Sequence, residues 1–168
     1  LHGALGSKKQ FSKIKELLSL HFEVHDMNFA GHGGTSTAHD FSIALFASNA
    51  IDYLDQRGID QITVFGYSMG GYVALAMALK LPQRIKKVIT LATKFDWTKA
   101  SVNREVQMLD PVKVEKKVPR FALHLQEDHY PTDWKTVMVK TAKMMSVMGN
   151  GDRLRNQDFA QIQVPVVM

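Results

Sequence analysis

The sequence predicts an α/β fold, in which a parallel sheet carries helices on both faces and a helical cap is added. Short apolar runs alternate with longer stretches of helical periodicity across residues 1–93, a pattern typical of strands and helices in a buried parallel sheet. At one strand-to-helix junction, a tight glycine-rich turn carries a serine at its tip. From about Lys94 to Gln161 the alternation stops and only helix-like pieces follow.

The individual elements follow from local patterns. Helical spacing of Phe11, Ile14, Leu17 and Leu18 indicates a first helix. Pro82 is expected to stop a later helix, the one that follows the serine-bearing turn. After a strand that ends at Leu1, the expected order is a helix near Ser7–Leu20, a strand near Phe22–Asn28, a helix near Phe41–Arg57, a strand at Gln61–Gly66, a helix at Met69–Leu81 and a strand at Lys87–Leu91.

The serine-bearing turn is Gly66-Tyr67-Ser68-Met69-Gly70-Gly71. Such a turn is so tight that only small residues fit at Gly66 and Gly70, and Ser68 is forced into a strained conformation with its hydroxyl presented to a ligand. A plain connecting turn is the alternative. The strand before it and the helix after it favour the nucleophile elbow, with Ser68 as the nucleophile.

A second glycine-rich loop, Leu1-His2-Gly3-Ala4-Leu5-Gly6, also joins a strand end to a helix. Glycine permits close approach and unusual dihedral angles, so the loop can point N–H groups at a developing negative charge. By itself it is an ordinary connection. Paired with the elbow, it predicts an oxyanion hole made by the N–H groups of Ala4 and Met69.

A third loop, Gly31-His32-Gly33-Gly34-Thr35-Ser36, follows the strand expected near Phe22–Asn28. The three loops together, in this order and spacing, resemble the α/β-hydrolase superfamily, most of all its esterase, thioesterase and C–C hydrolase branch. The resemblance covers Leu1 to about Leu91. It implies an architectural role for Gly31-His32-Gly33, so His32 is not expected to be catalytic.

Residues 94–160 are expected to form the cap, residues 1–93 the N-terminal part of the core, and residues 161–168 the start of the next core strand. Breaks fall at Pro111, Pro119, Pro131 and Gly149-Asn150-Gly151. Met138, Met144, Met145 and Met148 either line an adaptable apolar pocket or pack the cap onto the core.

Composition narrows the class of protein. The chain has 168 residues, 45% of them apolar, no cysteine and a net charge of +5, which allows one core and excludes disulfides and thiolate sites. Its basic residues are scattered, so nucleic-acid binding is not expected. No membrane span or signal peptide is visible, and a cytoplasmic location is expected. The oligomeric state stays open, as does an upstream segment, because the first residue is not Met.

A serine nucleophile needs a base and an acid that orients the base. The resemblance places the acid, and then the histidine, after the strand that begins near Val164. We therefore expect both beyond Met168, in a longer protein of which these residues are an internal piece. Asp96, after the strand at Lys87–Leu91, is the alternative acid, or else it caps the first cap helix. The histidines His124 and His129 are weaker candidates for the base, and His39 beside Asp40 is expected at a helix start.

The expected activity is that of a serine hydrolase acting on a small or medium carboxylic ester or thioester. We assign His2, Gly3, Tyr67 and Trp97 to the substrate pocket. The resemblance implies no metal and no organic cofactor. The alternatives are a C–C bond hydrolase that uses the same residues and a catalytically silent member that binds a ligand or signals.

Overall fold

The computed structural model describes all 168 residues and contains a parallel sheet of three strands in the order β1-β2-β3. β1 (Ile62–Tyr67) pairs with β2 (Ile85–Leu91) along its whole length, with Val64 opposite Val88 and Tyr67 opposite Leu91. The short strand β3 (Val166–Val167) pairs with β2 next to Val88 and Ile89. The β-segment expected at the end of the sequence is therefore present.

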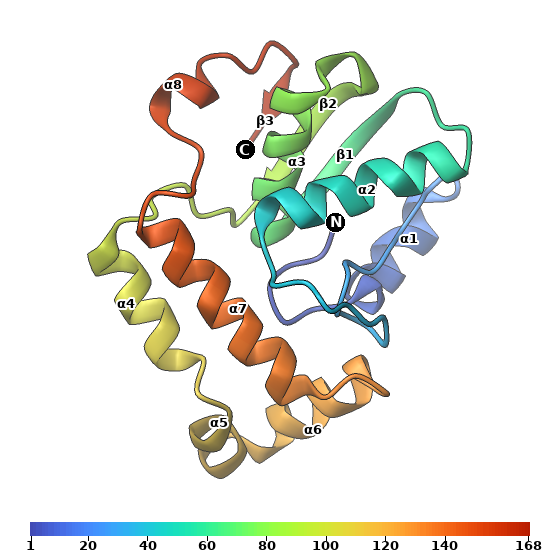
Figure 1. Cartoon of the computed structure of the whole chain (residues 1–168). Coiled ribbons are helices and arrows are strands. Elements are labelled where there is room, and N and C mark those ends of the chain that lie inside the picture. The colour runs from blue at the N-terminus through green and yellow to red at the C-terminus, as the bar shows by residue number, and fades with distance from the viewer.

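Helices cover both faces of the sheet (Figure 1). On one face, α3 (Met69–Lys80) packs directly against β1 and β2, and α2 (Ile43–Gln56) packs against α3. On the other face, η1 (Lys8–Phe11) and α1 (Ser12–Leu18) begin beneath β1, where the rings of Phe11 and Phe65 meet edge to face at 5.6 Å. This arrangement confirms the predicted fold class.

The strand predicted near Phe22–Asn28 is wrong, because this segment has no strand assignment. Its one backbone bond runs back to the preceding helix, from Phe22 N–H to Leu18 O, and the peptide groups of Glu23 to Asn28 bond no other peptide group. Leu1 lies beside β1, since the carbonyl of Leu1 accepts a hydrogen bond from Tyr67 N–H at 3.1 Å and the Leu1 amine donates to Phe65 O at 2.6 Å. A strand exists only through its hydrogen-bonded neighbour. Leu1 alone offers too little backbone for Phe22–Asn28 to pair with.

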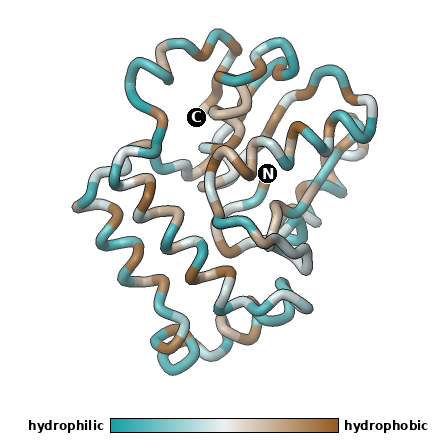
Figure 2. Tube along the Cα trace, viewed as in Figure 1, coloured by the Kyte–Doolittle hydropathy of each residue, from teal (hydrophilic) through white to brown (hydrophobic).

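No strand lies between β2 and β3, as expected, and helices fill this region. They are α4 (Lys99–Met108), α5 (Pro111–Lys117), α6 (Pro119–His129), α7 (Trp134–Gly149) and the short α8 (Asn156–Phe159). α4 to α7 lie together beside the core (Figure 1). Hydrophobic and hydrophilic residues alternate along α4 and α7 (Figure 2), which is typical of helices with one buried face.

Two hydrophobic clusters hold these parts together. The larger one has 22 buried residues and extends from β1, α2 and α3 into α7, through Val137, Met144, Met145 and Met148. The smaller one has five, Val114, Ala122, Leu125, Trp134 and Met138, and joins α5, α6 and α7. α7 contributes to both clusters, so it connects the outer helices to the sheet.

The predicted start of α2 needs correction, and the end of α3 differs from the prediction by one residue. α2 begins at Ile43, where the Ser42 side chain caps it by accepting from Leu45 N–H, so His39 and Asp40 lie before the helix rather than at its start. Asp40 pairs instead with Lys143 of α7. α3 ends at Lys80, and Pro82 opens the short η2 (Pro82–Arg84), as expected of a proline that stops a helix. No helix of the chain is both long and apolar enough to cross a bilayer.

Candidate active site

Ser68 lies in the turn between β1 and α3 with φ 51° and ψ −117°, a backbone conformation that residues other than glycine rarely adopt. The turn is as crowded as the sequence predicts. A Cβ atom at Gly66 would lie 2.4 Å from the backbone of Gly70, and one at Gly70 would lie 2.2 Å from the carbonyl oxygen of Leu1. Glycine is required at both positions because no side chain fits there.

Backbone and side-chain bonds hold this strained turn in place. Ser68 N–H donates to Leu91 O at 2.8 Å, which ties the turn to the end of β2. Ser68 O accepts from Gly71 N–H at 3.0 Å and from the hydroxyl of Thr93, also at 3.0 Å. Thr93 lies 25 residues from Ser68 along the chain, and no local sequence pattern points to this contact.

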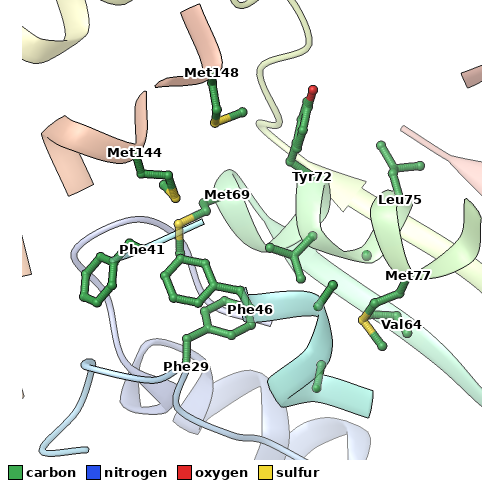
Figure 3. Packing of buried hydrophobic residues seen from close by; sticks show 14 of the residues in the cluster. Phe29, Phe41, Phe46, Val64, Met69, Tyr72, Leu75, Met77, Met144 and Met148 are labelled. Atoms are coloured by element: carbon green, nitrogen blue, oxygen red, sulfur yellow. The ribbon is translucent and has the colours of Figure 1, made fainter. Parts of the chain in front are cut away.

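Ser68 opens onto a cavity of about 220 Å³ at the carboxyl end of β1. Its lining is mostly apolar and comes from the N-terminal loop, the turn after β1, the loop after β2, and α2, α3, α4 and α7. The lining residues are Ala4, Ile43, Ser68, Met69, Tyr72, Ala92, Lys94, Trp97, Glu105, Met144, Met145 and Met148. Figure 3 shows Met144 and Met148 of α7 facing Met69 and Tyr72 of α3. Met138 instead lies in the smaller cluster.

The two predicted oxyanion donors, Ala4 and Met69, both line this cavity. Neither the Ala4 N–H nor the Met69 N–H donates a hydrogen bond within the chain. The loop that carries Ala4 passes close to the serine, since a Cβ atom at Gly3 would lie 3.4 Å from Ser68 Cβ and 2.9 Å from the Tyr67 ring. Two N–H groups without partners thus accompany the serine at one cavity.

Backbone strain is concentrated around the same cavity. The three residues other than glycine with positive φ are Leu5 at 58°, Ser68 at 51° and Ala92 at 52°. Ser68 and Ala92 line the cavity, and Leu5 directly follows Ala4. Strained residues of this kind persist only where the surrounding structure holds them, and they gather at functional sites.

The only charged side chains of the lining are Lys94 and Glu105. They form an ion pair, with Lys94 Nζ 2.7 Å from Glu105 Oε1. Lys94 follows β2 and Glu105 belongs to α4, so the pair joins the core to the helical region across one wall of the cavity. The Lys94 ammonium also lies 5.0 Å from the centre of the Trp97 ring.

Among the residues assigned to the pocket, Trp97 lines the cavity whereas His2, Gly3 and Tyr67 do not. His2 needs correction. It is 1% exposed, its Nδ1 bonds Gly3 O at 2.9 Å, and its Nε2 accepts from Phe29 N–H at 3.1 Å. Burial lowers its pKa to about 3. A neutral ring with both nitrogens bonded to the backbone has an architectural role.

His32 is also fully buried. Its ring lies 5.1 Å from that of His2 and stacks on Phe41 at 4.8 Å. Nδ1 bonds Ala30 O at 3.2 Å, while Nε2 has no partner. Burial lowers the pKa of His32 to about 4. This position beneath the loops, away from the cavity lining, agrees with the architectural role expected for Gly31-His32-Gly33.

The remaining candidates for acid and base do not reach the cavity lining. Asp96 is exposed, and its carbonyl accepts from the Ser101 hydroxyl at 2.9 Å. Thr98, not Asp96, caps α4. His124 lies exposed on α6, whereas His129 at the end of the same helix is completely buried. None of the residues that the sequence suggests as acid or base therefore lines the cavity at Ser68.

A second hollow, of about 510 Å³, lies at the opposite end of β1 and β2. It is open to solvent and almost entirely polar, with Asp55, Gly58, Ile59, Asp60, Gln61, Gln83 and Arg84 around it. It holds no candidate nucleophile. The carboxyl ends of parallel strands are also where such sheets bind ligands, so the cavity at Ser68 is the candidate site.

Comparisons with known proteins agree with this fold. A family model described as the alpha/beta hydrolase fold matches residues 1–153. A probable alcohol acetyltransferase of Wickerhamomyces anomalus is 31% identical over 93 residues, which are 54% of this chain and 27% of that protein. An sn-1-specific diacylglycerol lipase of Danio rerio, ABHD11, is 29% identical over 133 residues, 76% of this chain and 42% of the lipase. The chain thus matches less than half the length of either relative.

Solved structures extend the likeness to nearly the whole chain. An esterase from Exiguobacterium antarcticum superposes with a TM-score of 0.71 at 19% identity, covering 99% of this chain and 69% of the esterase. At this identity the likeness concerns the fold.

Proposed function

This chain belongs to the α/β-hydrolase fold family, and we propose that it acts as a serine hydrolase on small or medium carboxylic esters or thioesters. One observation carries the proposal. A strained serine at a strand-to-helix turn shares a small apolar cavity with two N–H groups that have no partner.

In the proposed reaction, Ser68 Oγ attacks the carbonyl carbon of the substrate and its proton passes to a histidine base. The N–H groups of Ala4 and Met69 stabilise the negative charge on the carbonyl oxygen, an effect for which a single donor contributes about 3–4 kcal/mol. The alcohol or thiol leaves with the proton, and water then releases the acyl group from Ser68.

We propose that the base and the acid come from residues beyond Met168. His2, His32 and His129 all bond backbone groups and lie outside the lining of the cavity. Asp96 is exposed and lies outside the lining, and the histidine–carboxylate pairs of the chain, His25 with Glu23 and His124 with Asp128, do not include it. Both observations favour a base and an acid that residues 1–168 do not supply.

We further propose that residues 94–160 form a cap whose helices α4 and α7 select the acyl group. Met144, Met145 and Met148 are unbranched and adapt to different shapes. A cavity of about 220 Å³ is small compared with the sites of drug-sized ligands. Short acyl chains should therefore be preferred.

Labelling with a fluorophosphonate tests the nucleophile. In the full-length protein that contains these residues, the probe should modify Ser68, and Ser68→Ala should abolish labelling. Ser146→Ala is the matched control, because Ser146 lies on α7 outside the cavity lining and bonds Ala142 O. Absence of labelling in folded wild-type protein would favour the ligand-binding alternative.

A substrate panel tests the reaction. Hydrolysis of p-nitrophenyl esters should be fastest for short acyl groups and should exceed cleavage of a vinylogous diketone. The opposite preference would favour the C–C hydrolase. The relative of 31% identity is called an acetyltransferase, so ethanol is added in parallel. Ethyl ester formed faster than free acid would show that the acyl group is transferred to alcohol instead of water.

A further inference from the structure

His129 connects the helical region to two loops of the core. It is the last residue of α6, and its side chain is 0% exposed. Nδ1 accepts a hydrogen bond from Gly33 N–H at 3.0 Å, and Nε2–H donates to Leu5 O at 3.1 Å. Because Gly33 N–H can only donate and Leu5 O can only accept, these bonds fix the neutral tautomer with the proton on Nε2.

Leu5 lies in a strained turn. Gly6 N–H bonds Gly3 O at 3.1 Å, which closes a β-turn with Ala4 second and Leu5 third. Leu5 has φ 58°, and a turn with positive φ at its third position normally carries glycine there. Leucine at this φ is held against its own preference, so something outside the turn must keep it in place.

The anchors of this turn differ in origin. Gly3 N–H donates to Gln10 Oε1 at 3.0 Å and Gly3 O accepts from His2 Nδ1 at 2.9 Å, so the first half is held by neighbours in sequence. The second half is held at Leu5 O by His129, which is 124 residues away. Ala4, with its unbonded N–H, lies between these two anchors.

We propose that His129 is a positioning residue for the oxyanion hole, which holds the Ala4 N–H in place through its bond to Leu5 O and thereby couples the seating of α6 to catalysis. This inference rests on the proposed function of Ser68 and Ala4. Burial supports it, because burial lowers the pKa of His129 and favours the neutral ring that both bonds require. The charged or titratable groups around this ring are Asp128 and His124 on α6, Lys9 on η1, and the buried rings of His2 and His32.

Two substitutions separate the bonds of His129. Asn places its amide near the position of Nδ1, where it can accept from Gly33 N–H, but it does not reach Leu5. Gln reaches the position of Nε2 and can donate to Leu5 O. His124→Asn on the same helix is the matched control, because His124 is exposed.

The test measures kcat and KM for a short p-nitrophenyl ester in the full-length protein, with the melting temperature of each variant. His129→Asn should lower kcat about tenfold, part of the ~10²–10³-fold effect of removing a whole oxyanion donor, with KM nearly unchanged. His129→Gln should restore most of kcat at a similar melting temperature, and His124→Asn should equal wild type. Equal kcat in the Asn and Gln variants would overturn the inference.

Two further results keep the test decisive. If the His129 variants do not fold, the ¹⁵N NMR spectrum of the wild-type imidazole should show the Nε2–H tautomer, and a proton on Nδ1 would overturn the inference. If wild-type protein shows neither probe labelling nor turnover, the proposed function fails and this inference fails with it. Normal wild-type turnover with equal variants refutes the role of His129 alone.

Discussion

The strain at Ser68 affects stability as well as function. A residue held at φ 51° and ψ −117° costs about 1–3 kcal/mol of folding free energy unless it is glycine. A glycine there would relieve the strain. It would also lower the free energy of unfolding by about 0.5–1 kcal/mol, because an unfolded chain with glycine is more flexible and loses more conformational entropy on folding. The strain term is the larger one, so the native serine should be a destabilising residue.

We therefore expect Ser68→Gly to be about 1 kcal/mol more stable to urea than Ser68→Ala, which removes the hydroxyl and keeps the strain. Urea unfolding followed by circular dichroism measures the difference. Both variants should lose fluorophosphonate labelling. Equal stability of the two variants would mean that the turn is not strained in solution.

The buried histidines should make stability fall in acid. Folded-state pKa values of about 3 for His2 and about 4 for His32 lie below the value of 6.5 expected in the unfolded chain. Between pH 6.5 and about 4 the unfolded state binds protons that the folded state does not, so stability falls as the pH falls. Each ring should contribute about 1.4 kcal/mol per pH unit in this window.

Urea unfolding between pH 7 and pH 4.5 measures this slope. His32→Asn should make the slope shallower by the contribution of one ring, because the amide can still donate to Ala30 O but cannot take up a proton in this range. His21→Asn is the control, since His21 is exposed and is not one of the neighbouring buried rings His2, His32 and His129. A slope in His32→Asn as steep as in wild type would show that His32 is not a buried neutral ring.

At the scale of elements, the ion pair between Lys94 and Glu105 joins the loop after β2 to α4 across the cavity. Glu105→Gln would leave the Lys94 ammonium without its partner in a mostly apolar site. We expect kcat/KM for an ester with a terminal carboxylate, relative to a neutral ester of equal length, to rise about fivefold, the equivalent of ~1 kcal/mol for such a partly exposed pair.

The measurement compares p-nitrophenyl hemisuccinate with p-nitrophenyl valerate. Lys94→Met serves as the opposite control, since it leaves no cation in the cavity and should lower the same ratio. An unchanged ratio in Glu105→Gln would place the charged pair away from the bound acyl group.

How far the sequence predicts an element depends on how local its causes are. The unit from β1 to α3 could be predicted because its apolar strand, its glycines and Ser68 are neighbours in sequence. Whether Phe22–Asn28 forms a strand could not be predicted in the same way, because a strand needs a hydrogen-bonded partner, and that partner is distant in sequence. The catalytic role of Ser68 stays a prediction.

The same reasoning explains what was missed at the candidate site. Thr93 and His129 contact Ser68 and Leu5 across 25 and 124 residues, and nothing near either of them in sequence indicates the contact. His2 has a glycine on its C-terminal side, a local pattern that pointed to the pocket, yet its environment comes from Phe29 and His32. Burial by distant segments cannot be inferred from spacing.

At the scale of the whole molecule, α7 determines whether the helical region unfolds separately from the core. Trp134 and Met138 of α7 belong to the smaller cluster, whereas Val137, Met144, Met145 and Met148 of the same helix belong to the larger one. A cluster of five buried residues is too small to fold alone. Loss of the larger cluster should therefore remove the smaller one in the same transition.

The two tryptophans of the chain allow this to be measured, because Trp97 lies in the larger cluster and Trp134 in the smaller one. In Trp97→Phe the fluorescence reports on the smaller cluster, and in Trp134→Phe on the larger. For each variant of this chain, the urea curve from fluorescence should coincide with its own curve from circular dichroism, as in a single cooperative transition. If Trp134 fluorescence instead changes at lower urea than the circular dichroism, α5 and α6 unfold before the sheet. The anchor that His129 gives to Leu5 would then be lost while the core remains folded.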